Sequence, residues 1–382
     1  MVFNISSKAN VLFGVGASEQ TGAKVKQFGW KKVICIFDKG IREAGIADKV
    51  IGNIKAAGVE VVEFAGVLPD PPDYVVEEAA EIARKAEVDG VVGIGGGSSM
   101  DTAKGVNILL TNPSPISLHY GFPSPARPGK GLVLVPTTSG TGSEISIAAV
   151  ITDTKNKTKA AIAGPICVPQ LAIIDPSFTL SLPPLTTAQN GIDTYSHAVE
   201  SYTSKMSNPF TDFLNEKVMQ LVVANLPVAV KNPSDIKARE ALSFAGMLAA
   251  MALNDAMIHL GHAIAHVVGA LTHTVHGTCC ALTTPIIVEY LADVLPDKVR
   301  RIGEILGLEL KSDLPAGELG REVAAGIRAF EKGVGLPVTF SEANIPEATL
   351  AQVAQLVKEG SPQSPKAVNP ELTLELLKKA YA

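Results

Sequence analysis

The sequence has few cysteines and no block of basic residues. Lys and Arg total 33 against 38 Asp and Glu, which gives a formal net charge of −5. Since no basic patch stands out, we expect no nucleic-acid partner. The four cysteines, Cys35, Cys167, Cys279 and Cys280, show no CxxC spacing. Adjacent cysteines rarely pair with each other, so we expect reduced thiols in a reducing compartment.

Long hydrophobic runs and targeting segments are also scarce. The best apolar run, Ala241 to Leu253, is too short to cross a bilayer and continues into Asn254 and Asp255. The N-terminal region has no basic stretch followed by an apolar one, which argues against secretion. With 46% hydrophobic and 19% charged residues, the chain reads as globular rather than disordered. We expect a cytoplasmic protein with no membrane partner.

The first half of the chain alternates short β-branched runs with amphipathic segments. Examples are the apolar run before Asp38, the helical pattern of Asp48 to Gly58, and the strand-like run before Gly95. This alternation predicts βαβ units and a parallel sheet. After Pro183 and Pro184 the apolar spacing becomes helical and strand signals vanish. We therefore predict an α/β nucleotide-binding domain with a Rossmann-like parallel sheet over residues 1–183. An all-helical domain that binds metal and substrate is predicted over residues 184–382.

A glycine loop follows one predicted strand and precedes a predicted helix. It consists of Gly95, Gly96, Gly97, Ser98 and Ser99. Such a loop lets the backbone approach a ligand, and the helix that follows directs free N–H groups at it, which suits a phosphate or pyrophosphate. The pattern is neither GxGxxG nor a Walker A loop. Tight packing of strand against helix is the alternative explanation.

Two further strand ends carry polar groups suited to a nucleotide. The turn PTTSGTGSE, from Pro136 to Glu144, is rich in hydroxyls and glycine. Such clusters are common in loops, but this one follows a strand of the same predicted sheet, where ligands bind. Asp38 ends another strand, and a carboxylate there favours NAD over NADP because it accepts hydrogen bonds from a ribose hydroxyl. A plain Asp-Lys-Gly turn is an equal alternative for Asp38.

Six of the seven histidines lie between residues 197 and 276. Asp193 and His197 are four residues apart, as are His262 and His266, so each pair shares a helix face. His276 follows in a loop-like segment. One carboxylate and three imidazoles suit a divalent transition ion such as Fe²⁺ or Zn²⁺. A lone histidine is more often a core or surface residue, which is our interpretation of His259 and His273.

In this order and spacing the motifs resemble the iron-containing (group III, iron-activated) alcohol dehydrogenase family. The matching pieces are DKG, GGGSSMDTAK, PTTSGTGSE, ITD with a downstream Lys159, DTYSHAVESY, GHAIAHVVGA and VHG. The resemblance implies that a primary alcohol and its aldehyde are interconverted by hydride transfer with NAD(P), and Asp38 favours NAD over NADP as the cofactor. It also implies Fe²⁺, with Zn²⁺ as the alternative, and a homo-oligomer of two or more subunits.

Site residues are carried over by position from this resemblance. The implied metal ligands, on which the alcohol oxygen would also lie, are Asp193, His197, His262 and His276. His266 would lie beside the substrate without ligating, and it is our candidate for moving the alcohol proton. The implied cofactor contacts are Asp38, Gly95, Gly96, Gly97, Ser98, Ser99, Asp101, Thr137, Thr138, Thr141 and Lys159. Cys280 stands where family members often carry asparagine.

Other functions fit parts of the same pattern. A glycerol-dehydrogenase-like zinc polyol dehydrogenase is the nearest rival. A dehydroquinate synthase-like lyase shares the arrangement but needs basic residues around its site. The segments GIDTYSHAVES and LGHAIAHVVGA contain neither Lys nor Arg, which disfavours the lyase. A non-catalytic protein that binds only a metal or only a nucleotide would not need both the predicted metal ligands and the predicted phosphate-binding loop.

Overall fold

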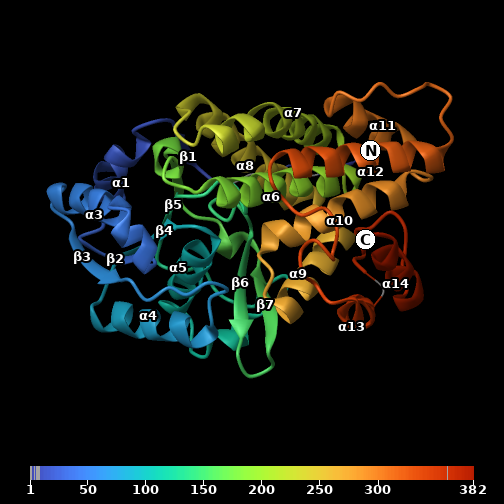
Figure 1. The fold of residues 1–382 in the computed structure, drawn as a ribbon. Coiled ribbons are helices and arrows are strands. Elements are labelled where there is room, and N and C mark those ends of the chain that lie inside the picture. Colours follow the sequence, from blue (N-terminus) through green and yellow to red (C-terminus); the bar gives the residue numbers. More distant parts are fainter. Residues whose placement is uncertain (1, 4, 6–8, 359) are drawn as a thin grey trace. The chain divides into compact units, whose positions relative to one another are not determined.

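The computed structural model describes residues 2–3, 5, 9–358 and 360–382. The described residues fall into two compact units: the first extends to Ser181, and the second consists of Leu182–Ala382 together with the described residues before Ser7. In the part of the chain that the structure describes, every strand belongs to the first unit and the second unit is helical (Figure 1).

The first unit is built on a six-stranded parallel sheet with the order β1-β8-β5-β4-β2-β3. Its strands are β1 (Val11–Phe13), β2 (Lys32–Ile36), β3 (Glu60–Phe64), β4 (Gly90–Gly95), β5 (Leu132–Pro136) and β8 (Leu171–Ile174). The predicted α/β fold with a parallel sheet is confirmed. A separate antiparallel ribbon pairs β6 (Ala148–Asp153) with β7 (Thr158–Ala163).

Apolar residues on both faces of the strands explain why helices cover both faces of the sheet. In β2, Val33 and Cys35 pack in one core cluster and Ile34 and Ile36 in another, because successive side chains point to opposite faces. Figure 1 shows the helices of the first cluster on one side of the sheet and those of the second on the other. The first cluster includes α1 (Thr21–Gln27) and α3 (Ile46–Ala56), and the second includes α4 (Asp73–Lys85) and α5 (Gly97–Leu109).

Strand order reverses between β2 and β4, which are parallel neighbours. Ligands of open α/β sheets bind outside the carboxyl ends of the strands at such a switch point. The chain leaves β2 at Asp38, which begins the short helix α2 (Lys39–Glu43), and it leaves β4 through the glycine loop into α5. The topology therefore brings two separately predicted motifs to one edge of the sheet. Short 3₁₀ helices complete this unit: η1 (Ala17–Gln20), η2 (Ile116–His119), η3 (Pro165–Cys167) and η4 (Pro176–Thr179).

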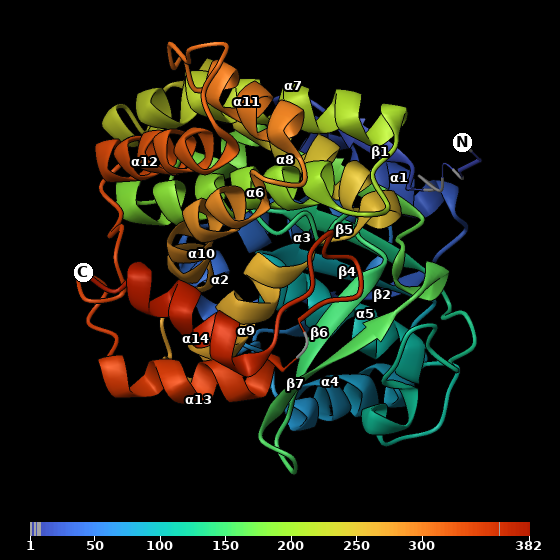
Figure 2. The ribbon, with the colours of Figure 1, turned by 90° about the vertical axis from the view of Figure 1, so that its right-hand side faces the viewer.

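The second unit is a bundle of helices in which α6, α7 and α8 pack together and α10 packs against α6, α9 and α12 (Figure 2). The helices are α6 (Pro184–Thr203), α7 (Pro209–Lys231), α8 (Ile236–Ala256), α9 (Leu260–Thr272), α10 (His276–Leu291), α11 (Pro296–Ile305), α12 (Ala316–Gly333), α13 (Glu347–Val357) and α14 (Pro370–Lys379). Their N-termini carry expected signals, such as the Asn208 capping box of α7 and the Asp235 cap of α8.

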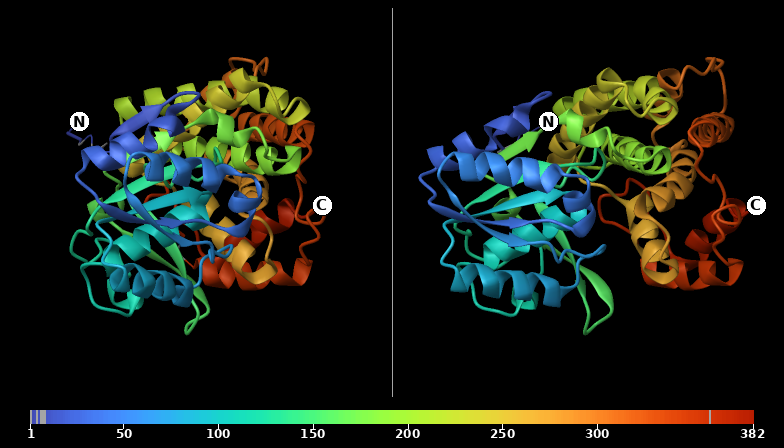
Figure 3. Two further views of the ribbon diagram at one scale, coloured as in Figure 1. Left: turned by 90° about the vertical axis from the view of Figure 1, so that its left-hand side faces the viewer. Right: turned by 60° about the vertical axis from the view of Figure 1, so that its left-hand side comes forward.

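Helices α9, α10, α13 and α14 share one apolar core cluster, which includes Ile264, Leu282, Phe340 and Leu377. Figure 3 shows this end of the chain, in orange and red, from two further directions. Burial of each such side chain contributes about 1.5–3 kcal/mol, so the packing fixes where α9 and α10 begin. Within the described residues no single helix is both long and apolar enough to cross a membrane. Only α8 and α9 together pass that test, and they are bent by 109°.

Candidate metal centre and nucleotide loop

One face of α6 carries three buried titratable residues: Asp193, His197 and Glu200. Their spacing of i, i+4 and i+7 puts them in a row along that face. Asp193 Oδ1 and His197 Nε2 are 3.8 Å apart. The helix therefore presents two carboxylates with an imidazole between them toward the neighbouring helices.

The Glu200 carboxylate anchors the first turn of α9. Its Oε2 accepts hydrogen bonds from the backbone N–H groups of His259 (2.8 Å) and Gly261 (3.1 Å), which have no partner within the helix. Its Oε1 lies 2.6 Å from Nδ1 of His262. A carboxylate accepts only, so the imidazole donates from Nδ1, and Nε2 is the ring nitrogen that faces Asp193. One side chain thus fixes both the helix and the tautomer of His262.

Helix α10 begins at His276, and Cys280 follows one turn later on the same face. Close approach of α10 to α6 depends on Gly277. A Cβ at this position would lie 2.1 Å from the carbonyl oxygen of Gln189 on α6. The missing side chain lets the first turn of α10, with His276 and Cys280, reach the row of groups on α6.

Four donor atoms from these three helices converge. Asp193 Oδ1 lies 3.6 Å from His262 Nε2, 3.4 Å from His276 Nε2 and 3.5 Å from Cys280 Sγ. All four atoms lie within 4.8 Å of one another. Asp193, His262 and Cys280 are buried, whereas the His276 side chain is 31% exposed. A carboxylate, two imidazoles and a thiol around one point form a set suited to a divalent transition ion, with one side open to solvent.

The remaining histidines divide into neighbours of this group and bystanders. The His197 ring stacks on His262 with centroids 4.6 Å apart, and His266 stacks on His276 at 5.1 Å. Both lie beside the four donors rather than among them. His259 Nε2 is 3.0 Å from Thr203 Oγ1 inside the protein, and His273 is exposed.

The charges in the group favour a bound cation. Burial opposes ionisation of Asp193, yet the charges of His197, His276 and His262 hold its pKa well below the usual range. Burial likewise opposes the Cys280 thiolate, but His276 and His262 lower its pKa. For Glu200 burial is again outweighed, mainly by His262, and the pKa falls to about 2. Metal ligands must be deprotonated, and these shifts favour that form of the acids of the group.

Sequence reasoning missed Glu200 and Cys280. Glu200 lies in the same motif as Asp193 and His197, and its i+7 position on α6 marks the shared face. Cys280 lies four residues after His276, which is the same signal that singled out the other pairs. Both spacings show only that residues share a helix face. They do not show which residue of another helix a side chain contacts, because the contacts of Glu200 and Cys280 join residues 60 to 90 positions apart.

At the other unit's sheet edge, the structure brings most predicted cofactor residues together. Ser99 Oγ donates to Asp38 Oδ2 at 3.4 Å, and Asp38 Oδ1 accepts from the backbone N–H of Ile41 as the cap of α2. Gly95 has a φ of +143°, and a Cβ there would lie 2.6 Å from Ser99 Oγ, so the tight exit from β4 requires glycine. Gly96 and Gly97 lead into α5 without a side-chain cap in the described structure, which leaves an anion site at the helix N-terminus.

The hydroxyl-rich turn after β5 lies against this loop. The Thr137 N–H donates to the Gly95 carbonyl at 3.0 Å. Thr138 and Thr141 are the nearest side chains to the Cβ positions of Gly96 and Gly97.

Asp101 and Lys159 are held by other parts of the unit. Asp101, near the start of α5, accepts from Ser143 Oγ at 2.7 Å and from the Val150 N–H at 3.1 Å. Lys159, on β7, pairs instead with Asp70 at 2.6 Å. The structure thus places Asp101 in a network that ties the turn after β5 to α5, and Lys159 in a separate ion pair.

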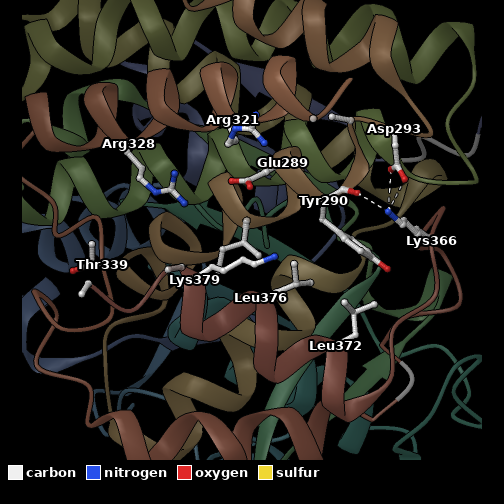
Figure 4. Close-up of a pocket in the computed structure, with 15 residues that line it drawn as sticks. Glu289, Tyr290, Asp293, Arg321, Arg328, Thr339, Lys366, Leu372, Leu376 and Lys379 are labelled. Atoms are coloured by element: carbon white, nitrogen blue, oxygen red, sulfur yellow. Dashed lines mark hydrogen bonds and ion pairs between the residues drawn. The ribbon is translucent and has the colours of Figure 1, made fainter. Parts of the chain in front are cut away.

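A pocket of about 820 Å³ lies elsewhere in the helical unit. Figure 4 shows charged side chains from α10, α12 and α14 around it, including Glu289, Arg321, Arg328 and Lys379. Lys366 at its rim is paired with Asp293 at 2.8 Å. None of the four converging donors is among the residues that line this pocket.

Fold and site together define a class of enzyme: an α/β unit of the nucleotide-binding type joined in one chain to a helical unit with a cluster of metal-binding side chains. The chain belongs to the iron-containing alcohol dehydrogenase family. Residues 8–176 match the iron-containing alcohol dehydrogenases, and residues 187–381 match the C-terminal region of the same family. The protein is therefore an alcohol and aldehyde oxidoreductase of that family.

Individual relatives agree with this assignment. The chain is 34% identical to 1,3-propanediol dehydrogenase of Citrobacter freundii, over 97% of this chain and 96% of the relative. It is 33% identical to NAD-dependent methanol dehydrogenase of Bacillus methanolicus, over 90% of each chain. A crystal structure of 1,3-propanediol oxidoreductase superposes with a TM-score of 0.95 and 30% identity over the full length of both chains.

Proposed function

We propose that the chain interconverts a primary alcohol and its aldehyde by hydride transfer with NAD, assisted by a divalent ion bound to Asp193, His197, His262 and His276. The observation that carries this proposal is the buried convergence of Asp193, His262 and His276 from three helices in a chain of this family. A relative whose name states NAD dependence supports the choice of cofactor. Fe²⁺ is the ion that the family name suggests, and Zn²⁺ suits the same donors.

The residues of the helical unit, proposed to be residues 184–382, have separate tasks. A bound divalent ion would supply Lewis-acid stabilisation of negative charge on the alcohol oxygen. Glu200 orients His262 through Nδ1, and the row on α6 holds Asp193 and His197 beside it. His266, stacked on His276 at the partly exposed side of the group, is proposed to take up the proton that leaves the alcohol.

Residues 1–183 are proposed to bind NAD at the switch point of the sheet. Asp38 would accept hydrogen bonds from the adenosine ribose, and Gly95 to Ser99 would hold the pyrophosphate with backbone N–H groups. Thr137, Thr138 and Thr141 line the same loop. Asp101 and Lys159, proposed as further contacts, are held in position by Ser143 and Asp70 respectively.

The first test is a screen of NAD-linked oxidation over short primary alcohols and diols with Fe²⁺ or Zn²⁺ added. We expect turnover of at least one alcohol, loss of turnover when a chelator removes the ion, and recovery when the ion is restored. Activity that survives complete metal removal, verified by elemental analysis, would indicate a metal-independent reductase of the maleylacetate type instead.

The same screen separates the alternatives. A glycerol-dehydrogenase-like enzyme would prefer polyols with Zn²⁺ over monoalcohols. A lyase would produce no net NADH with any alcohol. The segments GIDTYSHAVES and LGHAIAHVVGA, which carry Asp193 and His262, lack the Lys and Arg that a phosphorylated substrate would require as partners, so we expect the alcohols to be turned over.

Replacement of Asp38 by serine is expected to raise the NADP/NAD ratio of kcat/KM by about tenfold, the effect of relieving roughly 1.4 kcal/mol of repulsion toward a 2′-phosphate. Serine is the preferred substitution because Asp38 caps α2, and serine retains that hydrogen bond. Glu43→Ser is the matched control, since Glu43 is exposed on the same short helix. A ratio unchanged in Asp38→Ser would remove Asp38 from the cofactor site.

A further inference from the structure

The thiol of Cys280 is a member of the donor group that the proposed function leaves without a role. Its Sγ lies 3.5 Å from Asp193 Oδ1, 3.7 Å from His262 Nε2 and 3.6 Å from His276 Nε2. The residue has no solvent exposure. The preceding Cys279 is equally buried, but its Sγ faces the backbone oxygen of Thr274 at 3.6 Å. Two adjacent cysteines on one helix therefore have different surroundings.

Five of the six separations among the four donors match those around one tetrahedral ion, and the sixth, between the two imidazoles, is within 4.8 Å. Zinc binds sulfur at about 2.3 Å and nitrogen or oxygen at about 2.0–2.2 Å, so tetrahedral angles set S···N and S···O separations of about 3.6 Å and N···O separations of about 3.4 Å. The separations from Cys280 Sγ are 3.5, 3.6 and 3.7 Å. Those from Asp193 Oδ1 to the two imidazoles are 3.4 and 3.6 Å.

We propose that the Cys280 thiolate is a direct metal ligand and that it shifts the preference of the site toward Zn²⁺ and away from Fe²⁺. This inference rests on the metal site of the proposed function and puts Cys280 in the place of His197 among its four ligands. On binding, the S–H proton is released to solvent and a sulfur–metal bond forms. Thiolate is a soft donor that selects zinc, while harder nitrogen and oxygen sets also serve iron. His197 Nε2, 3.8 Å from Asp193 Oδ1, stays beside the same group as a further donor.

Cobalt substitution of the whole chain tests the sulfur–metal bond without relying on activity. Co²⁺ bound by thiolate absorbs strongly in the near ultraviolet, whereas nitrogen and oxygen ligands give no such band. The wild-type chain loaded with one equivalent of Co²⁺ is expected to show the band. Cys280→Ser is expected to lose it, and the matched control Cys279→Ser is expected to keep it.

Metal competition tests the change in preference. Loss of an outer-shell partner alone costs about 10–100-fold in metal affinity, so removal of a direct thiolate ligand is expected to lower the Zn²⁺/Fe²⁺ affinity ratio at least about tenfold. The ratio is expected to stay unchanged in Cys279→Ser. Both affinities are measured anaerobically by competition with a chelator of known affinity.

The outcomes separate this inference from the proposed function. Stoichiometric Co²⁺ in the wild-type chain without the thiolate band overturns the role of Cys280 and leaves the other ligands standing. A wild-type chain that binds no divalent ion overturns both. If the band persists in Cys280→Ser and disappears in Cys279→Ser, the sulfur ligand is Cys279, and the proposal for Cys280 is overturned. If Cys280→Ser does not fold, the wild-type and Cys279→Ser spectra still test the proposal. A band in both supports Cys280 as the ligand, and a metal-loaded wild type without the band overturns it.

Discussion

Replacement of His262 by alanine is expected to abolish metal binding and alcohol oxidation. The side chain is 2% exposed, and its Nε2 faces both Asp193 Oδ1 and Cys280 Sγ, so the alanine variant lacks one of the four converging donors. Because loss of an outer-shell partner already costs about 10–100-fold in metal affinity, loss of this ligand is expected to cost at least about 100-fold. Metal content after exhaustive dialysis is the measurement, followed by turnover of the alcohol found in the screen.

The same change also leaves Glu200 Oε1 buried without the imidazole that donates to it. An unsatisfied buried acceptor costs about 1–3 kcal/mol, so a lower melting temperature is expected as well. His273→Asn is the matched control, because His273 is exposed and asparagine tolerates its φ of 56°. Full metal occupancy in folded His262→Ala would contradict the assignment of His262 as a ligand.

The sheet was predictable because burial on both faces leaves a direct record in the sequence. The strand before Asp38 is apolar at successive positions, and β2 is buried on both faces. β1 and β7 were not predicted. β1 has only three residues, too few to show a pattern, and β7 combines Lys159 with several alanines, which are poor strand formers. Their pairing is set by contacts with β8 and β6, which lie far along the chain or across a turn.

The donor group was predictable in part for a related reason. Spacing along one helix is visible in a sequence, so Asp193 and His197 could be paired, and so could His262 and His266. Which helices meet is not visible. The structure shows that the approach of α10 to α6 depends on Gly277, and that this approach carries Cys280 into the group. Gly277 is important because its backbone lies close to Gln189. The sequence alone does not distinguish such a glycine from one at an ordinary helix start.

Replacement of Glu200 by glutamine is expected to weaken metal binding about 10–100-fold, although Glu200 lies outside the four-donor group. In this variant the side-chain oxygen of glutamine would accept the hydrogen bonds from the N–H groups of His259 and Gly261, as Oε2 of Glu200 does now. Its amide nitrogen would then face His262 Nδ1 as a donor. His262 would respond by moving its proton to Nε2, the atom that faces Asp193 and Cys280, and a protonated nitrogen cannot bind a metal.

This tautomer change gives the prediction a readout that simple loss of stability would not produce. Nitrogen chemical shifts of ¹⁵N-labelled histidine, in chains freed of metal and at a pH where His262 is neutral, are expected to place its proton on Nδ1 in the wild type and on Nε2 in Glu200→Gln. The melting temperature should change less than in Glu200→Ala, because glutamine still caps α9 while alanine leaves two buried N–H groups unpaired. Glu289→Gln, a carboxylate on α10 away from the imidazoles, is the control for the charge itself. Unchanged metal affinity in Glu200→Gln together with a proton on Nε2 would show that His262 does not bind metal through that atom.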